Sequence, residues 1–348
     1  MLARSRHFVL RSGAKLRTPL LIPSVSSKGF AFRDDGLSEV ATYLEVVGDA
    51  LTEALLVSAY DLHYRYLPDA DRLLAGQPWS TVYSNPALLV VDSGGYELSP
   101  LWEESAPVRG VWATRPFDSA AYAALIDRIP TTLDILVVTY DHVQKANDRP
   151  SYVEQVAQAS AFLDGRDHVM SDVLLRPPGG ETYLDPVTIE PAMASLRRFD
   201  VVGVTEKEAG NSVLARLVTI ARLRRLLDEG GVPLPIHVFG VLDPLLVTLY
   251  FMAGAEVFDG LSWLRFGNHR GVSVYREAAA VLSGHIDVPS NVREALSQAD
   301  YLAVLRVLKR RLRRWVETGG NAVVLESYQS EIDRVRVRLE EALGERIV

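Results

Sequence analysis

Short hydrophobic segments rich in β-branched residues recur along the first 262 residues of the chain. Each is a nearly continuous apolar run, which is typical of a strand buried on both faces of a parallel sheet. The eight segments are PLLIPSV (19–25), ALLVSAY (54–60), ALLVVDS (87–93), DILVVTY (134–140), DVLLRP (172–177), DVVGVT (200–205), IHVFGV (236–241) and EVFDGLS (256–262).

Amphipathic stretches, with apolar residues three and four positions apart, fill most of the gaps between these runs. The clearest cover residues 119–129, 150–163, 212–230 and 243–255. The last of them begins with Asp243 as a helix N-cap, followed by a proline in the first helical position, and ends at Gly254. Eight strand and helix repeats predict an α/β fold, a closed (β/α)8 (TIM) barrel; an open, doubly wound sheet is the alternative.

The strand pattern stops near residue 284, so we expect a barrel over residues 1–284 and a helical extension over residues 285–348. Within the extension, residues 290–345 are predicted to form two helices around a turn at residues 318–321. The first helix has an apolar stripe on one face and a basic run on the other. The basic run consists of Arg306, Lys309, Arg310, Arg311, Arg313 and Arg314.

Composition narrows the class of protein. The chain has 348 residues, 48% of them hydrophobic and 23% charged, which is typical of a globular protein and not of a disordered one. It contains no apolar run of membrane-spanning length. It also contains no cysteine, which excludes disulfides, thiol catalysis and cysteine-based metal sites. The seven histidines show no metal-ligand spacing. We therefore expect a cytoplasmic protein without metal or cofactor.

The net charge of −7 argues against a polyanionic partner, but the basic residues are unevenly distributed. The segment before the first acidic residue, Asp34, carries seven basic residues and therefore a charge of +7. This segment and the basic run near residue 310 are two candidate places for phosphate contacts. An arginine-rich start also resembles a transit peptide, but this one leads directly into the first predicted strand.

Carboxylates stand at the ends of several predicted strands, where barrels of this kind carry their chemistry. Asp92, Asp141 and Asp259 each lie at the carboxyl end of an apolar run, and Glu206 and Glu208 follow the sixth run. One such residue alone can be a helix N-cap or a structural hydrogen-bond acceptor; together they predict a converging acidic site. Two carboxylates facing one carbon suit glycosidic chemistry, in which one attacks the anomeric carbon and the other exchanges protons.

At these positions the sequence resembles the tRNA-guanine transglycosylase family, the queuine- and archaeosine-type enzymes. The resemblance runs in order along most of residues 7–271, and the DSGGY motif is its most specific part. It implies a pentosyltransferase that exchanges guanine in a polynucleotide for a 7-deazaguanine such as preQ0 or preQ1. The matching segments are TPLLIP (18–23), VDSGGYE (91–97), TYDHV (139–143), GVTEKE (203–208), and HVFGV (237–241) with VFDG (257–260).

The resemblance also implies a role for each matching residue. Asp259 would attack C1′ of the target nucleoside, and Asp92 would protonate the leaving base and later deprotonate the incoming one. Asp141 would accept hydrogen bonds from the amino-pyrimidine edge of the base, and Tyr96 and Phe239 would sandwich it. The other residues expected at the base are Ser93, Gly94, Gly95, Gly203, Val204 and Glu208. The residues expected to contact phosphates are Lys207, Arg265, Arg306, Lys309, Arg310, Arg313 and Arg314.

Two departures from the family bear on the substrate. The family's zinc site uses three cysteines and a histidine after the barrel, and this chain has no cysteine. Pro178 stands where the family offers a glutamine to the base, so base recognition is altered or Arg176 supplies the missing contact. One branch of the family modifies DNA, which makes DNA the favoured polynucleotide and tRNA the next. A free nucleoside as substrate, or a role as a non-catalytic, nucleic-acid-binding partner subunit, stays open, as does a homodimer or a partner protein.

Overall fold

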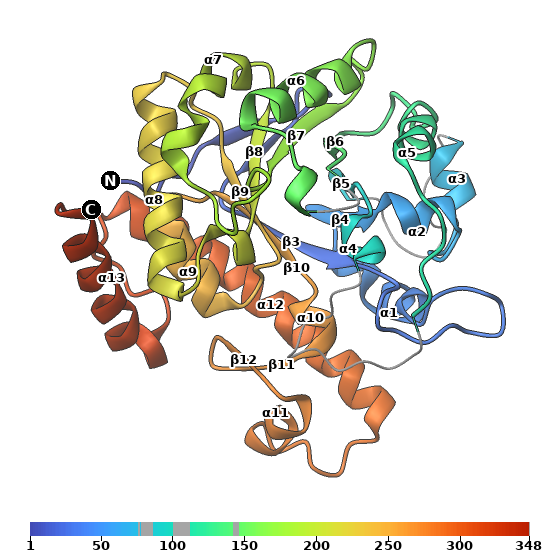
Figure 1. Ribbon diagram of the computed structural model, residues 1–348. Helices are drawn as coiled ribbons and strands as arrows, with labels where there is room; N and C mark the ends of the chain where they lie inside the picture. Colours follow the sequence, from blue (N-terminus) through green and yellow to red (C-terminus); the bar gives the residue numbers. More distant parts are fainter. Residues whose placement is uncertain (76, 78–85, 100–111, 142–145, 348) are drawn as a thin grey trace.

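The computed structural model describes residues 1–75, 77, 86–99, 112–141 and 146–347. Eight parallel strands form a closed barrel in the order β10-β3-β4-β5-β6-β7-β8-β9, surrounded by helices (Figure 1). The predicted (β/α)8 barrel is confirmed, and each strand overlaps one of the eight apolar runs. The strands are β3 (Leu20–Val25), β4 (Ala54–Ser58), β5 (Leu88–Asp92), β6 (Ile135–Val138), β7 (Met170–Leu175), β8 (Val201–Thr205), β9 (Ile236–Phe239) and β10 (Val257–Gly260).

Helices connect the strands and follow the last of them. The predicted N-cap of α9 is present, because the Asp243 carboxylate accepts hydrogen bonds from the amides of Leu245 and Leu246, each at 3.0 Å. The α-helices are α1 (Val40–Val47), α2 (Ala59–His63), α3 (Ala70–Leu74), α4 (Gly95–Leu98), α5 (Ser119–Ile126), α6 (Tyr152–Leu163), α7 (Met193–Leu196), α8 (Val213–Glu229), α9 (Pro244–Met252), α10 (Ser262–Arg265), α11 (Arg276–Leu282), α12 (Ser290–Glu317) and α13 (Gln329–Leu343). Short 3-10 segments are η1 (Gly48–Ala50), η2 (Ala146–Asp148), η3 (Pro186–Ala192), η4 (Glu206–Ala209) and η5 (Glu326–Tyr328).

An antiparallel hairpin, β1 (His7–Val9) and β2 (Lys15–Arg17), precedes the barrel and was not predicted. Phe8 and Leu10 of this segment are buried in the same cluster as barrel residues near the strand starts, such as Leu20 and Leu88. The hairpin therefore covers the amino-terminal end of the barrel with apolar side chains, the place where a (β/α)8 fold supports stability more than chemistry.

Alternate residues of each strand point into the barrel. These inward-facing side chains change from apolar to acidic along the length of the barrel. Val90, Met170 and Val257 belong to the apolar cluster inside the amino-terminal half. The positions two residues further along the same strands are Asp92, Asp172 and Asp259. The barrel interior is therefore apolar near the hairpin and acidic towards the carboxyl ends of the strands.

The two predicted C-terminal helices correspond to α12 and α13. Leu305, Leu312 and Trp315 of α12 are buried in the same core as the barrel. The Tyr301 hydroxyl donates to the carbonyl of Leu242 (3.2 Å), which follows β9. Near its other end, Arg313 Nε donates to the carbonyl of Thr18 (3.2 Å), which precedes β3. Helix α12 thus runs along the barrel from the carboxyl-terminal to the amino-terminal end (Figure 1).

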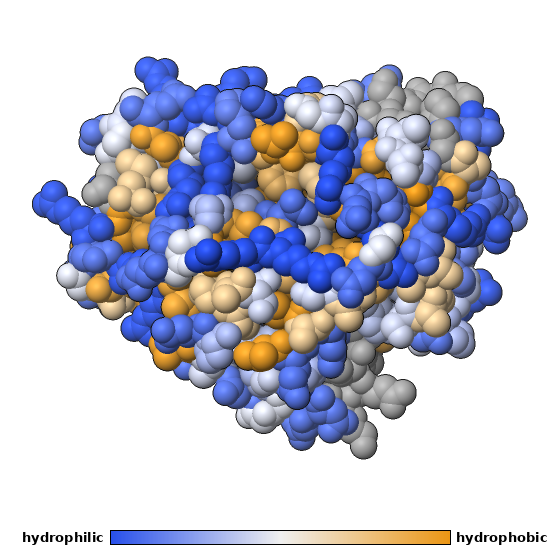
Figure 2. Space-filling view, turned by 90° about the horizontal axis from the view of Figure 1, so that it is seen from above, coloured by the Kyte–Doolittle hydropathy of each residue, from blue (hydrophilic) through white to orange (hydrophobic). Residues whose placement is uncertain are grey.

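The chain's ends and outer face complete the architecture. The amide of Leu2 donates to the carbonyl of Ile347 (3.0 Å), and both termini lie on the same side in Figure 1. A second short hairpin, β11 (Gly267–His269) and β12 (Val272–Val274), which was also not predicted, links α10 to α11. Figure 2 shows hydrophilic residues over much of the face seen from above, with smaller hydrophobic areas between them. In the part of the chain that is described, no helix is both long and apolar enough for a membrane span.

Candidate active site

Asp92 ends β5, and the turn that follows fixes its surroundings. The amide of Gly94 donates to Asp92 Oδ2 (3.2 Å), and Gly94 has a φ of 90°, a left-handed conformation that favours glycine. A Cβ atom at Gly94 would lie 3.0 Å from Cβ of Tyr60, so close packing also favours glycine here. Gly95 then starts α4, which carries Tyr96 and Glu97.

The electrostatic surroundings of Asp92 favour its protonated form. Burial, and then the negative charges of Glu97, Asp141 and Asp259, raise the pKa of Asp92 well above its usual range. Asp92 is the last residue of β5, Asp141 follows β6 and Asp259 lies near the end of β10, so the three predicted carboxylates share the carboxyl-terminal end of the barrel. A raised pKa is what general acid–base work near neutral pH requires of a carboxyl group.

Asp259 lies on β10 and is held by groups from two neighbouring strands. Ser24 Oγ on β3 donates to Asp259 Oδ2 (2.7 Å), and the Gly240 amide after β9 donates to Oδ1 (3.1 Å). His237 Nε2 lies 3.3 Å from the same Oδ1, an ion-pair distance. The residue is 6% exposed, so its carboxylate is almost buried and is held by two hydrogen-bond donors with the imidazole beside them. These contacts fix its orientation.

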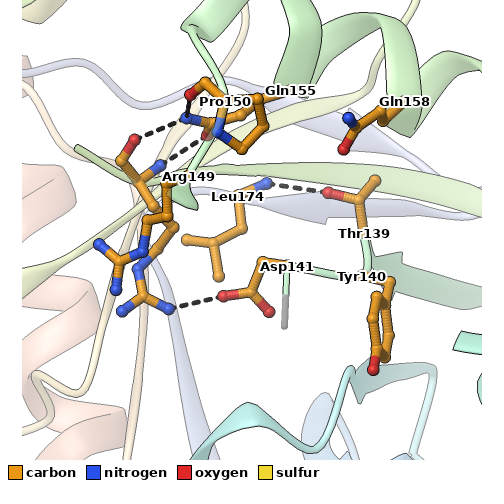
Figure 3. Close-up of a pocket in the computed structure, with 9 residues that line it drawn as sticks. Thr139, Tyr140, Asp141, Arg149, Pro150, Gln155, Gln158 and Leu174 are labelled. Atoms are coloured by element: carbon orange, nitrogen blue, oxygen red, sulfur yellow. Dashed lines mark hydrogen bonds and ion pairs between the residues drawn. The ribbon is translucent and has the colours of Figure 1, made fainter. Parts of the chain in front are cut away.

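Asp141 follows β6 and is also held on both oxygens. Ser93 Oγ donates to Asp141 Oδ1 (2.9 Å), and Arg176 Nη1 donates to Oδ2 (2.6 Å). In Figure 3, Asp141 lies beside Tyr140 and Thr139 at the edge of a small pocket. His142 and Val143 of the TYDHV motif lie outside the described residues. A base that bonded to Asp141 would have to share this carboxylate with Arg176.

Arg176 links the predicted Asp141 and Glu208 in one network. Its guanidinium pairs with both Glu208 oxygens, with Nη2 at 2.7 Å from Oε1. Thr205 and Arg149 also donate to Glu208, at 2.7 and 2.8 Å. Burial would raise the pKa of Glu208, but these partners, Arg176 first, lower it below its ordinary value. Arg176 therefore contacts two of the residues predicted to lie at the base, Asp141 and Glu208.

The pocket next to this network has a volume of about 80 Å³. Gln155 on α6 fixes its wall, because its side-chain amide donates to the Arg176 carbonyl (2.8 Å) and its side-chain oxygen accepts from the Arg176 amide (3.0 Å). The pocket combines amide, hydroxyl and guanidinium groups with one aromatic ring (Figure 3). It is lined by Thr139, Tyr140, Asp141, Arg149, Pro150, Gln155, Gln158, Leu174 and Arg176.

The two aromatic side chains predicted to sandwich a base come from α4 and β9, and each packs against other side chains. The Lys28 ammonium sits 4.6 Å from the centroid of the Tyr96 ring, and Arg265 donates to the Tyr96 hydroxyl (2.6 Å). The Phe239 ring packs on His237 with centroids 3.8 Å apart. It also covers Gly203, where a Cβ atom would lie 2.5 Å from Phe239 Cε2.

The remaining base-site residues take different places. Ser93 is buried and bonded to Asp141, as described above. Val204 on β8 is buried in the core between the barrel and its helices, so only its backbone can face a ligand. Lys207, just after β8, is exposed at the carboxyl-terminal end of the barrel.

The structure gives most of the predicted phosphate-binding residues another role. Arg265 is 4% exposed, beneath Tyr96. Lys309 and Arg313 pair with Glu53, which precedes β4, and Arg306 donates to the carbonyl of Ala50 (2.8 Å). Arg310 and Arg314 are exposed on the same stretch of α12. These helix residues therefore lie at the amino-terminal end of the barrel, away from the three aspartates.

The basic N-terminal segment is likewise used within the molecule. Arg4 pairs with Asp228 and Arg6 with Glu256, while Arg17 pairs with Glu317. Lys28, by contrast, is fully buried at the other end of the barrel, where its ammonium donates to the carbonyls of Tyr96 and Ser99, each at 2.7 Å. The basic residues at the start of the chain therefore mainly form ion pairs that attach this segment to the rest of the molecule.

Two buried residues of the site were not among the predicted ones. Asp172 on β7 and His237 on β9 are both fully buried, and His237 Nδ1 lies 2.6 Å from Asp172 Oδ2. Both stand within apolar runs, whereas the prediction considered polar residues just past each run. The signal that could have found them is an ionisable residue at an inward position of a strand. Within the described ranges, no cluster of His, Asp and Glu side chains is arranged to hold a metal ion.

Comparison with known proteins does not assign the chain to a family. The sequence matches no model of a known protein family, and a search of curated proteins finds no significant match. The fold and the site thus define a (β/α)8 barrel with a cluster of acidic residues at the carboxyl ends of its strands.

Proposed function

We propose that the protein is a base-exchange transglycosylase, which replaces guanine in a polynucleotide with a 7-deazaguanine through a covalent intermediate on Asp259. The observation that carries the proposal is the convergence of Asp92, Asp141 and Asp259 at the carboxyl-terminal end of one barrel. The motif resemblance named these same three residues. The proposal therefore rests on sequence motifs and on geometry together.

The two principal carboxylates have surroundings suited to different tasks. Asp259 is oriented by Ser24, Gly240 and His237, as a nucleophile requires. The raised pKa of Asp92 suits a group that gives and takes a proton. Such a division of roles between two carboxyl groups is the basis of retaining glycosyl transfer.

The reaction would proceed in two displacements. A lone pair of Asp259 forms a bond to C1′, the bond from C1′ to N9 of guanine breaks, and the base leaves with a proton from Asp92. The incoming 7-deazaguanine then gives its N9 proton to Asp92 and attacks C1′, and the Asp259 carboxylate departs. The target nucleotide must leave the base stack to reach the barrel.

Recognition of the base would fall to the network around Asp141. Asp141 accepts hydrogen bonds and suits the donor edge of guanine, while Arg176 donates them and suits its acceptor atoms. The two side chains are bonded to each other, so a bound base would replace or rearrange that contact. This arrangement supports Arg176 as the counterpart of the missing glutamine at Pro178.

DNA is the favoured polynucleotide in this proposal, and tRNA the alternative. The chain has no cysteine for the zinc site that the family uses near its tRNA-docking region. In its place after the barrel stand α11, α12 and α13. Lys207 is the predicted phosphate-binding residue that is exposed on the side of the aspartates.

A base-exchange assay tests the proposal. Purified protein would receive radiolabelled guanine with duplex DNA, single-stranded DNA or bulk tRNA in parallel, and Asp259→Asn would be the control. We expect label in DNA with the wild-type protein and none with the variant. Label in tRNA alone would replace DNA by tRNA in the proposal. Absence of label from all three pools, or full activity of Asp259→Asn, would contradict it.

A further inference from the structure

A chain of three ionisable side chains crosses the interior of the barrel. Asp172 on β7, His237 on β9 and Asp259 on β10 meet there, with His237 in the middle. The His237 ring nitrogens lie 2.6 Å from Asp172 Oδ2 and 3.3 Å from Asp259 Oδ1. Strands β7 and β10 are not neighbours in the barrel, so these contacts span its interior.

The packing around the three residues leaves little freedom. Asp172 and His237 are fully buried. Phe239 lies on the imidazole ring with centroids 3.8 Å apart. Gly203 makes room for the arrangement, because a Cβ atom there would lie 2.7 Å from Asp172 Oδ1 and 2.5 Å from the Phe239 ring. The imidazole orientation is therefore determined by its neighbours.

Charge balance favours a protonated imidazole between the two carboxylates. Burial alone would lower the pKa of His237, but Asp172 and then Asp259 outweigh it and raise this pKa to about 9. Two further acidic groups lie near these carboxylates: Asp92 on β5, whose own pKa is raised, is near Asp259, and Asp200, just before β8, is near Asp172. The neighbouring inward side chains on β3 and β8, Ser24 and Thr205, carry no charge.

We propose that Asp172 and His237 are positioning residues for Asp259, with His237 a buried imidazolium that holds Asp259 Oδ1 and directs Oδ2 towards C1′. The inference rests on the proposed function of Asp259 as a nucleophile. Oδ1 faces both the Gly240 amide and His237, whereas Oδ2 accepts from Ser24. Oδ2 is thus the oxygen with the fewer contacts.

A fixed positive charge beside Asp259 affects the two displacements in opposite ways. In the first step the carboxylate loses negative charge as it forms the ester, so the imidazolium opposes that step. In the second step the carboxylate leaves with its electron pair, and the imidazolium stabilises the charge that returns. His237 keeps its proton throughout, and proton transfer to the bases stays with Asp92.

The test combines two variants with two readouts. Asp172→Asn keeps a hydrogen-bonding group beside His237 but removes the negative charge, and His237→Gln keeps a donor beside Asp259 but removes the positive one. We expect both to slow exchange about 10- to 100-fold, the size of effect seen when a residue that orients a metal ligand is lost. We also expect a larger fraction of DNA trapped as a covalent protein adduct on denaturing gels, since departure of Asp259 is the step that slows.

The protonation state is measured separately, without reference to activity. In ¹H–¹⁵N correlation spectra of ¹⁵N-labelled protein at pH 7.5, the His237 signal, identified by its loss in His237→Gln, should be that of an imidazolium. It should move towards the neutral form in Asp172→Asn. His285→Gln, in the exposed loop after α11, is the matched control and should leave exchange and adduct levels unchanged.

The outcomes separate this inference from the proposed function. A neutral His237 in the wild-type protein, or adduct levels that fall together with turnover, would overturn the positioning role while base exchange stands. Wild-type protein without any exchange would overturn the proposed function, and the spectra would still report the charge of His237. If His237→Gln does not fold, His237→Asn identifies the signal, and the near-isosteric Asp172→Asn carries the test.

Discussion

At the amino-terminal end of the barrel, Glu256 is fully buried and accepts hydrogen bonds from Arg6 and Thr18. At the carboxyl-terminal end, Asp92 is half-buried, and its neighbours include Glu97, Asp141 and Asp259, which are also acidic. At the first end opposite charges are paired and hold the hairpin to the barrel. At the second, like charges are brought together at a cost in stability. The comparison separates the part of the molecule that stabilises the fold from the part suited to chemistry.

The largest expected effect is on catalysis, from Asp92→Asn. We expect turnover in the exchange assay to fall about 10²- to 10⁴-fold, the usual contribution of a general acid–base group. Folding raises the pKa of Asp92. The protonated Asp92 side chain therefore contributes to the free energy of unfolding at low pH, and this contribution is lost as the pH rises through the raised pKa. An uncharged amide avoids this loss. Thermal unfolding at pH 7 should therefore show a variant at least as stable as the wild type, and a clear loss of stability would contradict the comparison.

Glu256→Gln should have the opposite effect to Asp92→Asn, because it should reduce stability and leave activity unchanged. It leaves Arg6 without the carboxylate that it faces, and removal of one partner from a buried pair costs about 3–5 kcal/mol. Urea unfolding would measure the loss, and exchange activity per folded molecule should stay at the wild-type level. The exposed Glu345, which pairs with Arg225, provides the control variant Glu345→Gln. Reduced activity without reduced stability would show that the two ends are coupled.

The pH dependence of stability should carry the signature of His237. Its pKa rises from an ordinary value of 6.5 to about 9 on folding, so the protonated form stabilises the native state. That stabilisation is complete below about pH 6.5 and is lost as the pH rises through 9, with a size of about 3 kcal/mol at 1.36 kcal/mol per pH unit. Urea unfolding from pH 6 to 10 would measure it. The decline should be much smaller in His237→Gln, and equal declines in both proteins would assign it to other groups.

The smallest expected effect is on the salt dependence of nucleic-acid binding, and it distinguishes basic residues at the two ends of the barrel. Lys207 is exposed near the aspartates, whereas Arg314 is exposed on the part of α12 at the amino-terminal end. If the polynucleotide binds at the carboxyl-terminal end, Lys207→Gln should reduce by about 1 the slope of log affinity against log salt concentration. Arg314→Gln should leave that slope unchanged. Binding titrations with a fluorescent oligonucleotide at 50–200 mM salt would decide, and the reverse result would place the nucleic acid on α12.

The barrel could be predicted from the sequence because each buried strand is a nearly continuous apolar run. Runs such as 54–60 and 236–241 each contain one strand, β4 and β9, and the N-cap at Asp243 was equally recognisable. The hairpin β1–β2 was not, because strands of three residues with mixed polarity have no distinctive period.

The site was predictable in part, for a related reason. Asp92, Asp141 and Asp259 stand at strand ends, where a search by position finds them. Asp172 and His237 lie within strands, and their importance depends on a contact across the barrel that the sequence order does not contain. The partner of Lys309 is equally remote, because Glu53 is far from it in the chain. For this reason the basic face of α12 could not be recognised as a packing surface.

The hairpin at the amino-terminal end also has a kinetic consequence. Phe8 and Leu10 fill the barrel end opposite the aspartates, so a base bound among the aspartates would have to enter and leave at the carboxyl-terminal end. Under the proposed function, guanine has to depart before the incoming base can take its place. The two bases would therefore compete for one form of the enzyme, and initial-rate plots for polynucleotide and base should give the parallel lines of a ping-pong mechanism.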